Sequence, residues 1–138
     1  MRLPQSLGLL LTLLLTTAPA MADVVAVVSA KSPVTALTKS QVTDIFLGKA
    51  SRFPDGTQAK PIDQAEGTKV RDEFYDKIVG KSSAQIKAYW SKIIFTGRGQ
   101  PPPTVSSDSE MKQRIGHNPA AIGYIDRRLV DDSLRIVL

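Results

Sequence analysis

Apolar residues gather in short runs that predict the strands of the protein. Residues 23–30 form an almost unbroken Val/Ala run, which is typical of a buried central strand. Residues 58–63 predict a second short strand, because the turn-forming Pro54-Asp55-Gly56 comes just before them. Residues 121–125 predict a compact apolar strand, and residues 134–138 predict a last strand that closes the sheet.

Helices are predicted where apolar residues recur every three or four positions behind a capping residue. We expect them from Thr38 or Ser40 to Gly48, over residues 68–79, from Ser82 or Ser83 to Phe95, and over residues 107–115. The stretch 97–107 contains three consecutive prolines, so it is predicted to be an extended connector rather than an element. The order of the elements predicts an α/β fold with a mixed sheet flanked by helices.

The first 22 residues have the pattern of a secretory signal peptide. Arg2 precedes an apolar run over residues 7–15, and small residues follow at Ala18, Ala20 and Ala22. An apolar run of this length is too short to cross a hydrocarbon core of about 30 Å as a helix. We therefore expect cleavage after Ala22, export to a bacterial-type periplasm or out of the cell, and one domain over residues 23–138.

Composition excludes several classes of function. The 138 residues contain no cysteine and one histidine, His117, which excludes disulfides, thiolate metal sites and cysteine nucleophiles and disfavours a His-based metal centre. Basic residues outnumber acidic ones by 18 to 13, but they are scattered along the chain, so no nucleic-acid partner is expected. No recognisable nucleophile–base pair or cofactor motif is present, and we expect a protein that is not an enzyme.

The segment Ile62 to Lys69 carries the most informative chemistry, because a predicted strand passes there through a short loop into a helix start. Main-chain N–H groups at a helix start lack partners within the helix and favour an anion. Gly67 permits close approach, the Thr68 hydroxyl can donate, and basic side chains add charge. The candidate ligand-binding residues are Glu66, Gly67, Thr68, Lys69 and Arg71. On spacing alone, the same residues fit equally well the cap of an ordinary surface helix.

Several strings in this sequence, taken in order, resemble the periplasmic phosphate-binding proteins of ABC transporters. They are Leu37, Phe46-Leu47-Gly48-Lys49, Pro54-Asp55-Gly56, Glu66-Gly67-Thr68, Phe74 and Ala121-Ile122-Gly123-Tyr124. In that family a Ser-Gly-Thr triplet at a helix start binds phosphate, and an Ala-Ile-Gly-Tyr strand lies near the end of the same lobe. The resemblance covers residues 24–125 and implies the fold of one lobe of a type II periplasmic binding protein.

The resemblance implies that phosphate or a related oxyanion is recognised at the helix N-terminus, in phosphate transport or sensing, with a membrane transporter or sensor as partner. The sequence departs from the family in three ways: Glu66 stands where the triplet has Ser, residues 62–65 contain no Arg, and the length matches a single lobe. These departures leave open a ligand-free periplasmic accessory module that binds another protein. A homodimer of two lobes would rebuild a closed cleft.

Overall fold

The computed structural model describes residues 2–4, 13–15 and 23–138. The predicted signal peptide lies outside the described residues except for 2–4 and 13–15, and the predicted cleavage site after Ala22 adjoins this undescribed part. None of the helices that the structure describes is long and apolar enough to cross a membrane.

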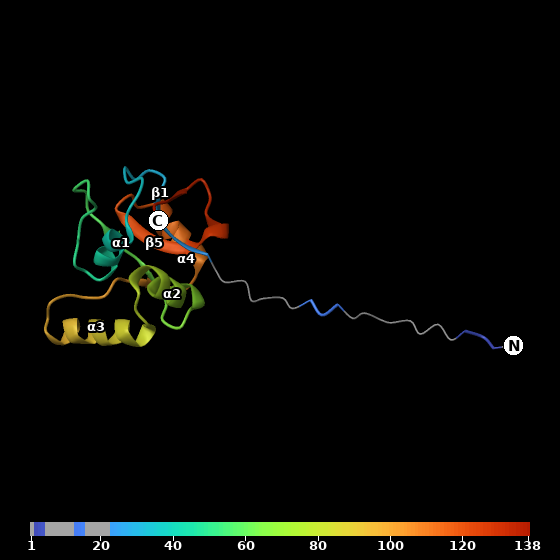
Figure 1. Cartoon of the computed structure of the whole chain (residues 1–138). Coiled ribbons are helices and arrows are strands. Elements are labelled where there is room, and N and C mark those ends of the chain that lie inside the picture. Colours follow the sequence, from blue (N-terminus) through green and yellow to red (C-terminus); the bar gives the residue numbers. More distant parts are fainter. Residues whose placement is uncertain (1, 5–12, 16–22) are drawn as a thin grey trace.

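A four-stranded mixed sheet forms the centre of the fold, as the order of the predicted elements indicated (Figure 1). Its strands lie in the order β2 (Lys60–Pro61), β5 (Ala121–Asp126), β1 (Val24–Ser29) and β6 (Leu134–Ile136). β1 is antiparallel to both of its neighbours, and β2 is parallel to β5. The Val/Ala run is therefore an interior strand of the sheet, as predicted.

The single strand predicted over residues 58–63 is wrong in its extent, because the chain there is shared between two sheets. β2 belongs to the main sheet, whereas β3 (Asp63–Gln64) pairs in parallel with β4 (Thr104–Val105). Successive amide groups of an extended chain point to opposite sides. The N–H of Ile62 donates to the carbonyl of Ile122, and the N–H of Asp63 donates to the carbonyl of Pro103, both at 2.8 Å.

The connector over residues 97–107 also differs from its prediction, since it contains strand β4. Proline lacks an amide proton but keeps its carbonyl, so a proline-rich segment can still accept hydrogen bonds from a neighbouring strand. The carbonyls of Pro103 and Val105 accept from the N–H groups of Asp63 and Ala65 at 2.8 and 2.9 Å. The connector is thereby attached to the strand that leads into the candidate site.

The helices begin close to the predicted capping residues. Thr38 and Ser82 form capping boxes with glutamines three residues on, and Ser107 accepts from the amide of Glu110. The helical elements are α1 (Lys39–Phe46), α2 (Lys69–Phe74), η1 (Tyr75–Val79), α3 (Ser83–Phe95), α4 (Asp108–Gly116) and η2 (Arg127–Leu129).

The α-helix predicted over residues 68–79 is wrong in its second half, where η1 is a π-helix. A π-turn holds more residues than an α-turn and is found mostly as a single turn within a helix. Here it accompanies two adjacent aromatic residues, Phe74 and Tyr75, which are both buried. The helical segment ends at Gly80, as predicted.

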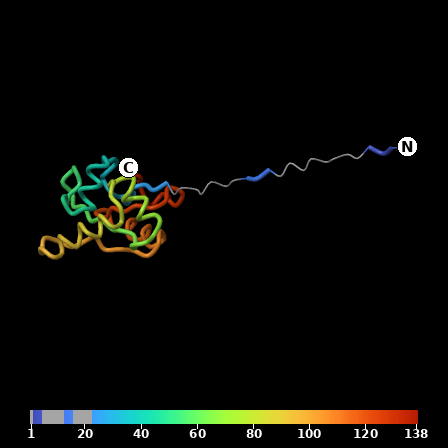
Figure 2. The backbone as a smooth tube through the Cα atoms, turned by 60° about the horizontal axis from the view of Figure 1, so that its bottom comes forward, coloured from blue at the N-terminus to red at the C-terminus, as the bar shows by residue number. Residues whose placement is uncertain are grey.

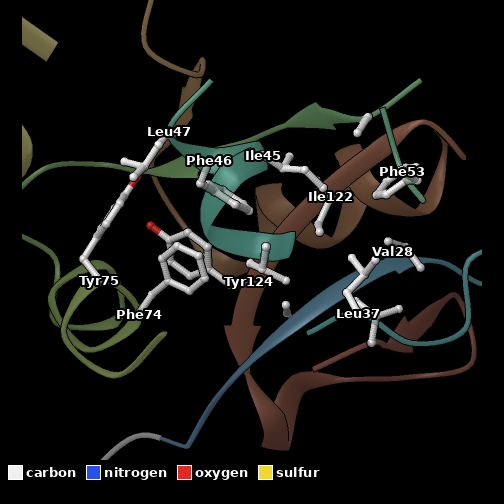
Figure 3. Packing of buried hydrophobic residues seen from close by; sticks show 14 of the residues in the cluster. Val28, Leu37, Ile45, Phe46, Leu47, Phe53, Phe74, Tyr75, Ile122 and Tyr124 are labelled. Atoms are coloured by element: carbon white, nitrogen blue, oxygen red, sulfur yellow. The ribbon is translucent and has the colours of Figure 1, made fainter. Parts of the chain in front are cut away.

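Helices cover both faces of the sheet, because alternate residues of each strand point to opposite sides. On one face Ala26, Val28, Ile122 and Tyr124 pack against residues of α1 and α2, including Phe46 and Phe74 (Figure 3). On the other face Val25, Val27 and Ile125 pack against Met111 and Ile115 of α4. The α/β architecture with helices on both faces is the predicted one.

Helix α3 lies apart from the other helices, and its C-terminal end projects from the body of the protein (Figures 1 and 2). Ile86 and Trp90 are its buried residues. The phenol of Tyr89 donates to the carbonyl of Leu47 at 2.6 Å and holds the helix to the end of α1. One side of α3 is therefore fixed to the fold, and the opposite side faces solvent.

Candidate anion-binding site

The loop that leads into α2 is a tight turn closed by its own hydrogen bonds. The carbonyl of Ala65 accepts from the main-chain N–H of Thr68 at 3.2 Å and from its hydroxyl at 2.8 Å. Gly67 has φ of +87°, a left-handed conformation that favours glycine, and no atom lies within 4 Å of the position a Cβ would take. The backbone of the turn is therefore exposed at Gly67, while the Thr68 hydroxyl proton is engaged within the loop.

The first amide groups of α2 are available to a ligand. The N–H of Asp72 donates to the carbonyl of Thr68 at 3.2 Å. The main-chain N–H groups of Lys69, Val70 and Arg71 have no acceptor among the residues that the structure describes. Such groups carry the partial positive charge of a helix start. The exposed side chain of Lys69 adds a full charge beside them.

The guanidinium of Arg71 is turned toward the interior of the protein. Its Nη1 donates to the carbonyl of Gln64 at 3.0 Å and lies 3.6 Å from a carboxylate oxygen of Asp63. The group also lies over the ring of Tyr75, 5.3 Å from the centroid. Only 14% of the Arg71 side chain is exposed, so a large part of its charge is offset by internal partners.

A buried carboxylate, that of Asp63, lies beneath the loop. Asp63 is 1% exposed and accepts hydrogen bonds from the phenols of Tyr75, at 2.5 Å, and of Tyr124. Burial, and next the negative charge of Asp63, raise the pKa of both tyrosines well above the ordinary value. Both phenols therefore remain neutral donors, and the carboxylate is held in one position.

A second buried polar side chain links the loop to α4. The side-chain amide of Gln64 donates through Nε2 to a carboxylate oxygen of Asp108 at 2.6 Å and to the carbonyl of Tyr124 at 3.2 Å. Burial raises the pKa of the Asp108 carboxyl, and the hydrogen bond from Gln64 acts in the opposite direction. Together, Asp63 and Gln64 fix the strand that delivers the candidate loop.

A cavity of about 400 Å³ adjoins the loop. Of the five predicted residues, Glu66 and Arg71 line it, whereas Gly67, Thr68 and Lys69 lie beside it on the turn and the helix start. Asp63 also lines the cavity, as do Lys87 and Ser91 of α3. Lys87 could not be selected from the sequence, because no local signal marks which residue of α3 faces a loop in another part of the chain.

Neither His117 nor Asp131 lines this cavity. No group of three or more His, Cys, Asp or Glu side chains that could hold a metal ion occurs in the described part of the chain. His117 is exposed, and its Nδ1 lies 2.7 Å from the carbonyl of Gln113 at the end of α4. Asp131 forms an ion pair with Lys112 at 2.7 Å.

Comparison with known proteins gives structural matches and no sequence match. No family model and no curated protein matches this sequence. A protein from Clostridium perfringens, described as a phosphate ABC transporter substrate-binding protein with bound phosphate, matches with a TM-score of 0.65 at 24% identity. The match covers 83% of this chain and 43% of that one. This chain has the fold of a phosphate-binding-protein lobe.

Two further structures match this chain. An ABC-type phosphate transport receptor from Vibrio cholerae has a TM-score of 0.65 at 22% identity, with 83% of this chain and 44% of that chain covered. PstS from Borrelia burgdorferi has a TM-score of 0.60 at 17% identity, with 83% and 46% covered. The lobe spans less than half the length of each. The resemblance found in the sequence is therefore confirmed at the level of the fold.

Proposed function

We propose that the protein recognises phosphate or a related oxyanion at the loop 65–71 and serves phosphate transport or sensing outside the cytoplasm. The observation that carries this proposal is the match of 83% of the chain to a lobe of a protein whose structure contains bound phosphate. Transport and sensing need reversible binding rather than covalent chemistry. We accordingly propose that this protein binds its ligand reversibly and is not an enzyme.

The geometry of the loop supports the proposal. The exposed turn at Gly67 and the available amides of Lys69, Val70 and Arg71 lie next to one another, and together they offer several donors to a single anion. A hydrogen bond from a donor to a charged ligand contributes about 1.5–3 kcal/mol. The side chain of Lys69 adds charge at the helix start.

Two features of the same loop limit the affinity. Glu66 places a carboxylate at the cavity, and this carboxylate repels a dianion. Arg71 has its charge partly offset by Asp63. A single lobe also contacts its ligand from one side. We therefore expect a dissociation constant well above that of a two-lobed clamp, unless a second copy of the chain or a transporter or sensor protein supplies the other side.

Thermal unfolding tests the proposal, with the chain that begins at Asp23 and with phosphate, sulfate and acetate added in turn. A ligand at about a hundred times its dissociation constant stabilises a protein by about 2.7 kcal/mol, which raises the Tm of a domain this size by roughly 10 °C. We expect phosphate to raise the Tm more than the other two anions. An unchanged Tm with every anion at millimolar concentration would contradict the proposal.

Substitutions at two helix starts localise the binding. Lys69→Gln should lower the stabilisation by phosphate, because Lys69 is the first residue of α2. Lys39→Gln is the matched control, since Lys39 is an exposed lysine at the first position of α1. Equal effects of the two substitutions would indicate a general response to charge and not a site at the loop.

The substitution Glu66→Ser tests the expected repulsion. Serine removes the carboxylate from the cavity and restores the donor that the family triplet has at this position. We expect phosphate to bind about tenfold more tightly, or better, since one charge-assisted hydrogen bond is gained. Asp132→Ser, an exposed acidic residue on the polar loop before β6, is the control for the change in net charge. Titration calorimetry measures both constants.

Export is part of the proposal, and the predicted signal peptide supports it. Cleavage after Ala22 would release a chain that begins at Asp23, and all the helices and strands that the structure describes lie after this point. Mass spectrometry of the protein recovered from the periplasm of the expressing cells tests the cleavage site. An uncleaved chain would contradict this part of the proposal.

A further inference from the structure

The excess positive charge of the folded region lies in one segment. Residues 81–107 contain four basic residues and no acidic residue: Lys81, Lys87, Lys92 and Arg98. Residues 23–80 contain eight basic and eight acidic residues, and residues 108–138 contain five of each. The basic residues are scattered along the chain, but over each of the two flanking ranges, 23–80 and 108–138, acidic residues equal them in number.

The segment consists of helix α3 and the connector that follows it, and one side of the helix is exposed. Five residues of α3 recur at intervals of three and four and are all exposed: Ala84, Lys87, Ala88, Ser91 and Phe95. The side opposite, with Ile86 and Trp90, is buried against the fold. The exposed side therefore combines basic, small and apolar residues, and Lys87, Ser91 and Ile94 on it also line the cavity beside the loop.

Large apolar side chains are exposed where α3 ends. Phe95 is 91% exposed and Ile94 is 48% exposed. Within residues 23–138 the remaining large apolar side chain with comparable exposure is Leu129, at 43%, on the separate element η2. Phe95 and Ile94 lie between Lys92 and Arg98, so the apolar tip is flanked by positive charge. Figure 2 shows that this part of the chain projects beyond the rest of the fold.

We propose that the exposed side of α3 and its tip at Ile94 and Phe95 dock on the surface of a lipid bilayer that contains anionic phospholipids. The basic side chains contact the headgroups, and the aromatic tip enters the boundary between headgroups and acyl chains. Amphipathic helices that lie on membranes have the same combination of basic residues with Phe or Leu. An aromatic ring also suits the interface between water and lipid.

The shape of the surface favours a bilayer over an acidic protein. Phe95 stands on a projecting end of a helix, and a projecting apolar side chain on a protein partner needs a matching pocket. A fluid bilayer accepts such a tip without a preformed pocket. Exposed apolar patches rimmed by polar residues mark interaction sites, and membrane surfaces are among these. The basic flanks supply the charge complementarity to anionic headgroups.

Vesicle sedimentation tests the proposal with the chain that begins at Asp23. One set of vesicles contains phosphatidylcholine alone, and the other contains one-third phosphatidylglycerol. We expect binding to the anionic vesicles that weakens as salt is added, because exposed charges are screened. Absence of binding to the anionic vesicles, or equal binding to both kinds, would overturn the proposal.

Two variants separate the charge from the apolar tip. Lys87→Gln with Lys92→Gln and Arg98→Gln should weaken binding by about a hundredfold, since each basic residue near an anionic surface contributes about fivefold. The control, Lys31→Gln with Lys39→Gln and Lys49→Gln, changes the net charge equally at exposed lysines outside α3. Equal losses in both triple variants would show that net charge alone acts, and this result would overturn the assignment to α3.

The apolar tip is tested at Phe95. Phe95→Ser with Ile94→Ser should weaken binding by about tenfold or more, because the double variant lacks the apolar side chains that would be buried in the bilayer. Leu129→Ser is the control at an exposed apolar residue on another element. Phe95→Trp should retain binding, and its fluorescence should shift to the blue with anionic vesicles. A tryptophan that stays in water while the protein is bound would contradict insertion of the tip.

Discussion

The Asp63 carboxylate determines how the charges of the candidate site are arranged. It is buried, it accepts from two tyrosine phenols, and it lies 3.6 Å from the guanidinium of Arg71. Burial of a charge is costly unless hydrogen bonds and a countercharge offset the loss of water. Asp63 has both, and in return it offsets part of the charge of Arg71 at the cavity beside the loop. The contact that stabilises the fold should therefore also weaken the proposed binding of an anion.

We expect Asp63→Asn to destabilise the protein by about 2–4 kcal/mol, since it removes a charged acceptor from two buried phenols and leaves Arg71 without its countercharge. The free energy of unfolding in urea measures the loss. Asp132→Asn, at an exposed position, is the control and should leave this free energy nearly unchanged. An Asp63→Asn protein as stable as the parent would show that the buried charge contributes nothing to the fold.

At the residue scale the sequence indicates the loop but not the network beneath it. Glu66, Gly67 and Thr68 are adjacent in the sequence, so the turn that they form can be anticipated from glycine and capping preferences. Asp63 is separated from Tyr75 by 12 positions and from Tyr124 by 61. A contact of that kind depends on how β3, α2 and β5 pack, and a single sequence has no pattern that pairs these three side chains.

At the scale of elements, the predictions that hold are those set by local chemistry. Thr38 and Ser82 begin helices because each forms a capping box with a glutamine three residues later. The division of residues 60–64 between two sheets was not predicted, because it depends on acceptors at Ile122 and Pro103, far along the chain. The π-turn after Phe74 was not predicted either, because helical periodicity in the sequence does not distinguish it from an α-turn.

The contact between α4 and β5 gives a prediction at this scale. A Cβ on Gly123 would lie 2.5 Å from the sulfur of Met111 and 3.0 Å from Cδ1 of Ile115. Gly123→Ala should therefore push α4 from the sheet and cost about 1–3 kcal/mol, as other overpacked cores do. The free energy of unfolding in urea measures the cost.

Gly116→Ala is the matched control, because Gly116 is the last residue of α4 and its nearest neighbour atom would lie 3.6 Å from the new Cβ. Alanine restricts the unfolded chain more than glycine and favours a helix, so this variant should be as stable as the parent or slightly more stable. If both variants were destabilised equally, close packing at Gly123 would not be the cause.

Considered as a whole, the molecule combines a lobe whose charges are balanced with a projecting helix that carries the excess of positive charge. The sequence predicted the lobe, because helix and strand periods and the resemblance to phosphate-binding proteins agree. It did not predict the projection, since helical periodicity marks the buried side of α3 but not how far the helix stands from its neighbours. The proposed anion loop and the proposed membrane surface meet at Lys87, which lines the cavity beside Glu66.

The stability of the whole molecule should depend on pH in the alkaline range. Burial and the charge of Asp63 raise the pKa of Tyr75 and Tyr124 above the ordinary value of 10.0. The folded protein therefore keeps two phenol protons that the unfolded chain releases. Stability is complete below about pH 10 and falls as the pH rises, by about 1.4 kcal/mol per pH unit for each tyrosine. Urea unfolding between about pH 9 and pH 11 measures the slope.

The variant Tyr75→Phe isolates one of the two contributions. It removes one buried phenol, so its free energy of unfolding should fall with a slope smaller by about 1.4 kcal/mol per pH unit than that of the parent. Tyr89→Phe is the comparison, because Tyr89 donates to a main-chain carbonyl instead of to a carboxylate and burial alone raises its pKa. If Tyr75→Phe leaves the slope unchanged, the phenol of Tyr75 loses its proton in the folded protein as readily as in the unfolded chain, and Asp63 would then not hold it as a neutral donor.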